Sequence, residues 1–267
     1  MQTRLSAAFL QTPDGREADA ILRKCVHCGF CTANCPTYQL LGDELDGPRG
    51  RIYLIKEMLE GAEPTRATQL HLDRCLTCRA CETTCPSGVA YGRLLDIGRH
   101  HMEQVVPRTL RERLLRRAIL ATVPYRRRVA GVLAVGRALR WLSPPSLRRS
   151  IPGVTPAGAW PAPRHPRRML VLTGCVQSAT AGGINAAAAR VLDRLGISLV
   201  AAADECCGAL AHHFSEEELA RRQMRRNIDA WWPEIERGVE ALVVTASGCG
   251  AMIRDYGQML RDDPRYA

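Results

Sequence analysis

Eight of the twelve cysteines in this 267-residue chain fall into two short runs that have the same spacing. The first run is Cys25, Cys28, Cys31 and Cys35, followed by Pro36, and the second is Cys75, Cys78, Cys81 and Cys85, followed by Pro86. Every cysteine of the first run recurs 50 residues later, so the two runs form an internal repeat. The shared pattern, C-x2-C-x2-C-x3-C-P, is typical of loops that bind cubane [4Fe–4S] clusters.

Two such runs in one chain predict that the clusters exchange ligands, because the fourth cysteine of each run ligates the other cluster. The predicted ligands are Cys25, Cys28, Cys31 and Cys85 for cluster 1, and Cys75, Cys78, Cys81 and Cys35 for cluster 2. Structural zinc is the alternative, but zinc sites use paired C-x2-C knuckles and leave no role for this third cysteine. His27, inside the first run, is either a surface neighbour of cluster 1 or a residue that tunes its potential by hydrogen bonding.

The other four cysteines each follow a short apolar run. Cys175 comes after residues 169–173, Cys206 and Cys207 come after 197–203, and Cys249 comes after 241–245. Because parallel strands place sites at their carboxyl ends, we expect these cysteines to meet at one sheet edge. They could bind a third iron–sulfur cluster or zinc, and the alternatives are buried free thiols or a redox-active pair. Two further candidates, for proton relay to a quinone, are His212 and His213.

The elements that must position these residues differ between the two halves of the chain. Helices are predicted over residues 16–24, after Gly47-Pro48-Arg49-Gly50 as far as Gly61, and over 89–106, which gives a small helical domain around metal. The later half alternates apolar runs with predicted helices at 185–195, 215–232 and 250–260. Ser215 with Glu218 is a capping-box signature for the second of these helices. This alternation predicts a parallel α/β layer.

The positive charge of the chain is concentrated in one segment. The chain has 37 Lys and Arg against 27 Asp and Glu, but residues 108–149 hold twelve Arg and one Glu. Val129, Val132, Leu133, Gly136 and Leu139 form an apolar stripe within it. We expect this segment to dock on a partner or an anionic membrane, unless it is a packed helix with a solvated basic face. Nucleic acid is the competing partner for such charge, but only two aromatic residues, Tyr125 and Trp141, are present to stack bases, so none is expected.

Composition and cysteine usage indicate a cytoplasmic protein. The 46% hydrophobic and 24% charged residues are ordinary for a globular chain, and no apolar run approaches the roughly 18 residues of a membrane span. Clustered cysteines in a reducing compartment indicate metal binding rather than disulfides. Neither Gly248-Cys-Gly250 nor Gly174 to Gly183 completes a nucleotide-binding motif, so flavin and substrate chemistry must lie in another polypeptide.

Beyond the double cysteine run, three later motifs are Thr-Gly-Cys175, Glu-Cys206-Cys207-Gly208 and Thr-Ala-Ser-Gly-Cys249-Gly. With Gly50-Arg-Ile-Tyr, residues 185–196 (NAAAARVLDRLG) and residues 227–236 (NIDAWWPEIE), the chain resembles the family of glycolate oxidase iron–sulfur subunits. The resemblance implies an electron-transfer subunit of a 2-hydroxy-acid oxidase, with FAD only in partner flavoprotein subunits and a respiratory acceptor such as a quinone. A related lactate or glycerol-3-phosphate dehydrogenase subunit is the alternative, and an iron–sulfur protein that binds nucleic acid is the alternative of another class.

The predicted fold class is α+β and multi-domain. An N-terminal α-helical two-cluster ferredoxin-type domain covers residues 1–106, and an Arg-rich helical segment with a Pro-rich linker covers 107–166. A three-layer-like α/β cysteine-rich domain of the CCG type covers 167–267. The family pattern has a further cysteine, in CxxC, that Ala246 and Met252 do not supply around Cys249, and it usually continues into a second such domain. We therefore expect a single, truncated copy of this domain.

Overall fold

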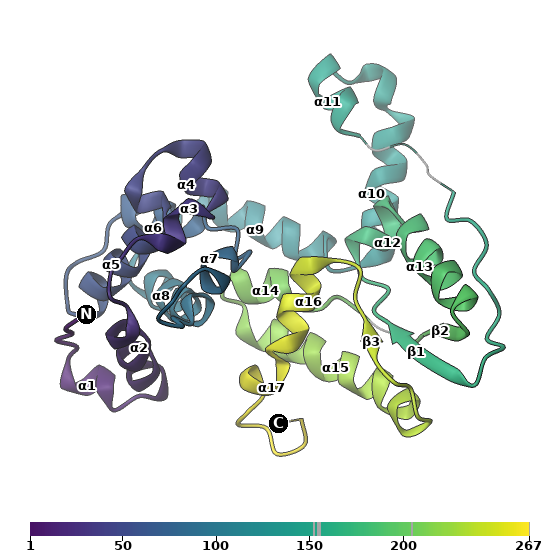
Figure 1. Cartoon of the computed structure of the whole chain (residues 1–267). Coiled ribbons are helices and arrows are strands. Elements are labelled where there is room, and N and C mark those ends of the chain that lie inside the picture. Colours follow the sequence, from purple (N-terminus) through teal and green to yellow (C-terminus); the bar gives the residue numbers. More distant parts are fainter. Residues whose placement is uncertain (152, 154–155, 204, 267) are drawn as a thin grey trace. The chain divides into compact units, whose positions relative to one another are not determined.

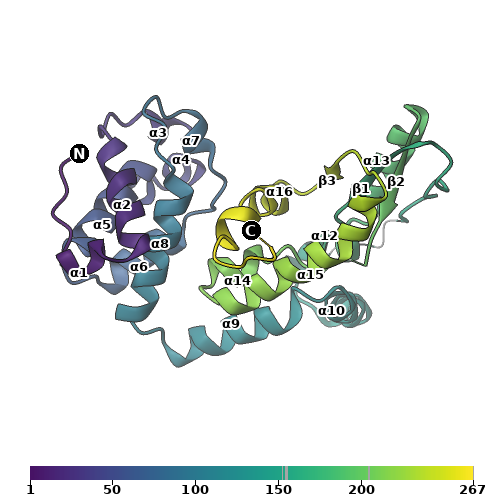
Figure 2. The same cartoon turned by 90° about the horizontal axis from the view of Figure 1, so that it is seen from below.

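The computed structural model describes residues 1–151, 153, 156–203 and 205–266. It divides into two compact units, Met1–Leu110 and Arg111–Ala267 (Figures 1 and 2). The arginine-rich and proline-rich stretch that follows residue 110 belongs to the second unit. In the described residues, no helix is both long enough and apolar enough to cross a bilayer.

The first unit is helical. Its elements are α1 (Ala7–Leu10), α2 (Pro13–Lys24), α3 (Phe30–Ala33), α4 (Pro36–Leu41), η1 (Glu44–Asp46), α5 (Pro48–Leu59), α6 (Arg66–Asp73), α7 (Ala80–Thr83) and α8 (Tyr91–Val105). The central helix is α8, which packs against α2, α5 and α6. The buried residues Leu22, Ile55, Leu72, Leu94 and Leu95 form the centre of its core. The three helices expected from the sequence in this half are therefore confirmed.

Helix α5 begins where the sequence predicts, and a glycine sets its position. Pro48 stands at the first helical position, where its missing N–H costs nothing. A Cβ on Gly50 would lie 2.2 Å from the carbonyl oxygen of Glu44, so only glycine lets α5 approach η1 this closely. After the helix, Gly61 adopts a φ of 104°, the left-handed conformation that commonly ends helices.

The second unit is mixed. Its elements are α9 (Leu110–Thr122, beginning at the last residue of the first unit), α10 (Arg126–Ala138), η2 (Arg140–Leu142), α11 (Pro145–Ser150), β1 (Arg167–Val171), α12 (Val176–Thr180), α13 (Gly183–Arg194), β2 (Ile197–Ala201), α14 (Ala209–His213), α15 (Glu217–Glu236), β3 (Leu242–Val243), α16 (Ser247–Arg254) and α17 (Tyr256–Met259). The three strands form a parallel sheet in the order β2-β1-β3, with Met169 of β1 opposite Leu199 of β2. The predicted α+β fold class is confirmed.

Helices cover both faces of this sheet. Leu170 and Val200 point into a core shared with α15, α16 and α17, whereas Val171 and Leu199 pack against Ala189 of α13 on the opposite face. Neighbouring strand residues alternate between the two cores because side chains alternate across a strand. The result is the three-layer arrangement that the sequence predicts.

One local prediction is wrong. The capping box expected at Ser215 and Glu218 does not form, because α15 begins at Glu217, with Glu216 as the N-cap residue and no side-chain cap bond. Ser215 instead has a φ of 61°, which is left-handed. Its backbone N–H bonds to the carbonyl of His212, so Ser215 closes the end of α14 rather than opening α15.

Candidate metal centres

The two cysteine runs fold into loops with the same backbone shape. His27 and Thr77, 50 residues apart, have φ angles of 58° and 52°. The residues after the second cysteine, Gly29 and Arg79, have φ angles of 85° and 58°. Left-handed backbone on either side of the second cysteine curls each loop tightly. For Thr77 this conformation is strained, since β-branched residues rarely adopt it, and such strain is typical of functional loops.

Each loop closes around a cavity that also contains the fourth cysteine of the other run. The first cavity, with about 430 Å³ of empty space partly open to solvent, is lined by Cys25, Cys28, Cys31, Cys81 and Cys85. The second, with about 290 Å³, is lined by Cys35, Cys75, Cys78 and Cys81. Both predicted ligand sets thus surround separate cavities in the exchanged combination.

The two cavities adjoin. Pro48, Cys81 and Tyr91 line both of them, so these side chains lie between the two spaces. Cys28 and Cys78, the central cysteines of the two loops, are exposed at the surface. Each cavity therefore adjoins the other cavity on one side and reaches the protein surface, at Cys28 or Cys78, on another.

The donor set fits iron–sulfur clusters better than single zinc ions. Four thiolates on one tetrahedral zinc, with bonds of about 2.3 Å, would bring all sulfurs within about 4 Å of one another. Among the described residues, no three cysteine sulfurs lie within 4.8 Å of one another. Burial raises the pKa of Cys81 well above its usual range, and the neighbouring Cys75 raises it further. A positively charged metal centre would therefore be needed to hold Cys81 as the thiolate that ligation requires.

Three buried side chains to which the sequence assigned no role of their own hold the second loop in place. Arg99 donates from Nη2 to the carbonyls of Leu72 and Cys75, each at 2.8 Å, and so connects the end of α6 to the start of the loop. The Tyr91 hydroxyl donates to Cys75 Sγ at 3.5 Å. Arg51, fully buried, lines the second cavity. A long polar side chain on an otherwise apolar helix face was the only available sequence signal.

The histidines singled out from the sequence lie close to cysteines. His27 is exposed and lines the first cavity, and its pKa is lowered by partial burial and by the charge of Arg49. His212 and His213 end the short helix α14, directly after the Cys206-Cys207-Gly208 turn.

The four C-terminal cysteines meet at the expected edge of the sheet. Cys175 precedes α12 after β1, Cys206 and Cys207 follow β2, and Cys249 lies in the first turn of α16 after β3. Gly208 has a φ of 86°, the left-handed turn that the adjacent cysteines need. Cys175 donates to Cys206 Sγ at 3.5 Å, and the hydrogen bonds continue from Cys206 to Cys207 and from Cys207 to Cys249.

The hydrogen bonds along this row of thiols all run the same way, with Cys175 as the first donor and Cys249 as the last acceptor. Donating a hydrogen bond to Cys206, together with burial, raises the pKa of Cys175. Cys206 and Cys207 each accept one bond, which lowers the pKa, but donating the next bond and burial outweigh it and raise the pKa to about 11 and about 12. Cys249 only accepts, so the hydrogen bond from Cys207 lowers its pKa. In the metal-free domain Cys249 is the first of the four to become a thiolate.

Two buried side chains fix the backbone of the adjacent cysteines. Asn227 donates from Nδ2 to the carbonyl of Cys206 at 3.0 Å, and the Tyr256 hydroxyl donates to the carbonyl of Cys207 at 2.8 Å. Asn227 also bonds to Tyr256 at 3.1 Å and accepts from the N–H of Glu205. Neither residue had a role assigned from the sequence: Asn227 opens the 227–236 stretch quoted for the family resemblance, and Tyr256 stands in no motif.

Two family descriptions match the chain. Residues 21–89 match the family described as 4Fe-4S dicluster domain, and residues 169–254 match the family described as cysteine-rich domain, CCG. These stretches contain the two candidate cluster cavities and the C-terminal row of cysteines. Fold and site together define an iron–sulfur protein that joins a dicluster domain to a cysteine-rich α/β domain.

Three similar proteins carry names that agree with this class. The glycolate oxidase iron-sulfur subunit of Escherichia coli is 57% identical over 270 residues, which is 100% of this chain and 66% of the relative. A probable glycolate oxidase iron-sulfur subunit of Bacillus subtilis is 31% identical, over 92% of this chain and 61% of the relative. A subunit of the heterodisulfide reductase of Methanosarcina barkeri is 24% identical, over 85% of this chain and 56% of the relative. No solved structure matches significantly.

The chain belongs to the family of glycolate oxidase iron–sulfur subunits, in which a 4Fe-4S dicluster domain precedes a cysteine-rich domain. It spans 66% of the length of the E. coli relative and 61% of that of the B. subtilis relative.

Proposed function

We propose that this chain is an electron-transfer subunit of a glycolate-oxidising complex. It takes electrons from a partner flavoprotein that oxidises glycolate to glyoxylate and passes them toward a respiratory acceptor. Residues 1–106 and 167–267 act as its two functional domains, joined by residues 107–166. The E. coli and B. subtilis relatives, both named for glycolate oxidase, support the substrate class.

The observation that carries the proposal is the pair of adjoining cavities with exchanged cysteines. Cys25, Cys28, Cys31 and Cys85 hold one [4Fe–4S] cluster, and Cys75, Cys78, Cys81 and Cys35 hold the other. Two clusters in adjoining cavities that share Pro48, Cys81 and Tyr91 as lining residues give an electron a short path from one to the other. The exposed Cys28 and Cys78 give each cluster a ligand at the surface, where a partner can exchange electrons with it.

The decisive experiment purifies the chain anaerobically together with whatever flavoprotein it retains. We expect at least eight irons and eight acid-labile sulfides per chain, and bleaching of the visible iron–sulfur absorption when glycolate is added. L-Lactate and glycerol 3-phosphate, added separately, distinguish the related dehydrogenases. A colourless, zinc-loaded protein would contradict the proposal outright.

We further propose that Cys175, Cys206, Cys207 and Cys249 bind a third iron–sulfur cluster. The continuous row of hydrogen-bonded sulfurs at one sheet edge supports a metal site. Their spread favours a cluster over a single zinc ion, since no three of these sulfurs lie within 4.8 Å in the described chain. Twelve irons in the full chain, falling by four in Cys249→Ser, would support the third cluster. Eight irons in both proteins would refute it.

The acceptor side of the complex involves the arginine-rich helices, and an anionic membrane is the partner that we propose for them. Val132 and Val135 of α10 are exposed, as are Leu139 and Trp141 just beyond it, and arginines flank them. Exposed apolar residues on a basic helix are typical of binding to anionic lipid. Flotation with anionic vesicles but not with neutral ones would support membrane contact, and indifference to lipid charge would refute it.

A further inference from the structure

One side of the second cavity is formed by a buried arginine. Arg51 has no exposed surface, and it lines this cavity together with Cys35, Cys75, Cys78 and Cys81. A guanidinium is always charged, and burying it is costly unless it is fully hydrogen-bonded. Its position is imposed by the close approach of Gly50 to η1, which brings the first turn of α5 against Asp46.

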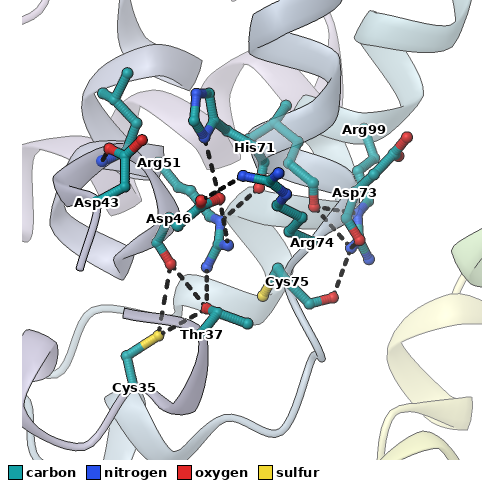
Figure 3. A network of polar contacts seen from close by, with 12 residues as sticks. Cys35, Thr37, Asp43, Asp46, Arg51, His71, Asp73, Arg74, Cys75 and Arg99 are labelled. Carbon is teal, nitrogen blue, oxygen red and sulfur yellow. Dashed lines mark hydrogen bonds and ion pairs between the residues drawn. The ribbon is translucent and has the colours of Figure 1, made fainter. Parts of the chain in front are cut away.

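All three guanidinium nitrogens of Arg51 have acceptors (Figure 3). Nε donates to the carbonyl of His71 at 2.7 Å, and Nη1 donates to Thr37 Oγ1 at 3.1 Å. Nη2 lies 3.4 Å from Asp46 Oδ1. These contacts fix the orientation of the Arg51 guanidinium group, with Nη1 directed at Thr37.

The buried carboxylate behind Arg51 is shared with two other side chains. Asp46, also fully buried, is shared with Arg74, whose Nη1 lies 2.7 Å from Oδ2, and with His71, whose Nδ1 lies 3.0 Å from Oδ1. The carboxylate of Asp43 lies within 4.8 Å of Asp46 and His71, but it is exposed to water, which screens its charge. Inside the protein, the two arginines share the single buried carboxylate of Asp46. The cation nearer to the cavity is Arg51, whereas Arg74 is partly exposed to water.

A single hydroxyl connects this charge to a cysteine sulfur. Thr37 Oγ1 accepts from Arg51 and lies 3.2 Å from Cys35 Sγ (Figure 3). Thr37 also donates its only hydroxyl proton to the carbonyl of Asp46 at 2.8 Å. A cysteine that ligates iron has lost its proton and can only accept, so Thr37 divides its donation between the Asp46 carbonyl and Cys35 Sγ. The Arg51 charge polarises the Thr37 hydroxyl and strengthens that donation.

The first cavity has no equivalent. The residue 50 positions after Thr37 is Ser87, which lines the first cavity, but in the described chain it has no hydrogen bond to an arginine. Arg49 lines that cavity, but its side chain is 35% exposed and bonded to Glu44 at 2.6 Å. Its charge is therefore largely neutralised and screened by water. The twofold repeat of the cysteines is not matched by a repeat of the charge.

We propose that Arg51, acting partly through Thr37, raises the reduction potential of the cluster held by Cys35, Cys75, Cys78 and Cys81 above that of its neighbour. This inference rests on the two clusters of the proposed function. A reduced cluster carries one more negative charge, which a nearby buried cation stabilises in a low-dielectric site. Net charge and hydrogen bonds to sulfur are the means by which proteins set these potentials.

The difference in reduction potential gives electron transfer between the two clusters a preferred direction. The first cluster is oxidised by one electron as the second is reduced by one, and no proton or other reactant is needed. Electrons entering at the first cluster collect on the second and leave near the exposed Cys78. Arg51 and Thr37 are positioning residues in this scheme, because neither of them ligates iron.

The test is a redox titration of the full chain, followed by electron paramagnetic resonance. In Arg51→Met we expect the potential of one cluster to fall while the other stays unchanged, and Cys35→Ser identifies which signal belongs to that cluster. Arg51→Lys, which keeps the charge, should keep most of the wild-type potential. Thr37→Val removes only the hydroxyl from a side chain of the same shape, and should lower the same potential by a smaller amount.

Ser87→Ala is the matched control, since it removes the corresponding hydroxyl at the other cavity and should leave the second cluster unchanged. If Arg51→Met does not fold, Thr37→Val decides alone. A full iron content with both potentials unchanged in Thr37→Val and in every folded Arg51 variant would overturn the inference while leaving the proposed function intact. If the wild-type chain binds no iron, the proposed function itself fails.

Discussion

Asn34 and Thr84 occupy equivalent positions in the two cysteine runs, 50 residues apart, and they hydrogen-bond to each other at 2.6 Å. A residue that contacts its own counterpart in a repeat lies beside the local twofold axis. Helices α3 and α7, which carry the two third cysteines, pack against each other across this axis. The fourth cysteines, Cys35 and Cys85, directly follow these contact residues. Each therefore lines the cavity formed by the loop of the other run.

This arrangement makes a prediction about ligand exchange. Cys85→Ser should alter the spectrum and potential of the cluster whose other ligands are Cys25, Cys28 and Cys31, because its sulfur lies in that cavity. Cys35→Ser should alter the other cluster. Electron paramagnetic resonance of the two reduced variants distinguishes the signals. The reverse pattern, in which each serine affects the cluster of its own run, would show that the ligands are not exchanged.

A second prediction concerns the approach of α5 to η1. Gly50→Ala should reduce the free energy of unfolding by about 1–3 kcal/mol, because the new Cβ would overlap the carbonyl of Glu44. It should also displace Arg51 from its acceptors. Gly131→Ala is the control. It lies within α10 with no atom within 4 Å of a new Cβ, and alanine there should stabilise the chain by about 0.5–1 kcal/mol.

Chemical denaturation of both variants measures the two effects. Equal changes in unfolding free energy at the two glycines would contradict the steric reason given for Gly50.

A third prediction concerns the support of the C-terminal cysteines. Tyr256→Phe should cost about 1–3 kcal/mol of unfolding free energy, because it leaves the buried carbonyl of Cys207 and one N–H of the Asn227 amide without a partner. Tyr266→Phe removes a hydroxyl that bonds to Asp229 near the surface and should cost less than about 1 kcal/mol. We also expect Tyr256→Phe, unlike Tyr266→Phe, to lower the iron content of the third site. A full iron content in a destabilised Tyr256→Phe would show that the hydroxyl supports the fold but not the site.

The parts of the site that depend on local spacing or on strand order could be predicted from the sequence. Ligand spacing is local, so both cysteine runs and the turn at Gly208 could be read directly. Strand and helix alternation brought Cys175, Cys206, Cys207 and Cys249 to one edge, because the topology of parallel sheets is restrictive.

The polar network behind Cys35 could not be predicted in this way. Arg51, Asp46 and Thr37 come from α5, η1 and α4, and their contacts exist only because Gly50 lets two backbones approach. In the sequence, Arg51 is one more charged residue in an amphipathic helix. The capping box at Ser215 failed for a related reason, since the end of α14 controls the conformation of Ser215. Local patterns predict local structure until a neighbouring element requires the same residue.

The last prediction tests the direction of the thiol row in the metal-free chain. Cys175 and Cys249 are both partly exposed, but hydrogen bonding raises the pKa of Cys175 and lowers that of Cys249. The thiolate is the nucleophile, so iodoacetamide at neutral pH should modify Cys249 faster than Cys175. As the pH rises, the rate at Cys249 should level off at a lower pH than the rate at Cys175, because the pKa of Cys249 is lowered and that of Cys175 is raised. Cys207→Ser tests the cause. A serine hydroxyl can still donate to Cys249, so this variant should keep the fast reaction, and Cys207→Ala, which cannot donate, should slow it. Mass spectrometry of the alkylated peptides gives both rates, and equal rates at Cys175 and Cys249 across the pH range would rule out the directional row.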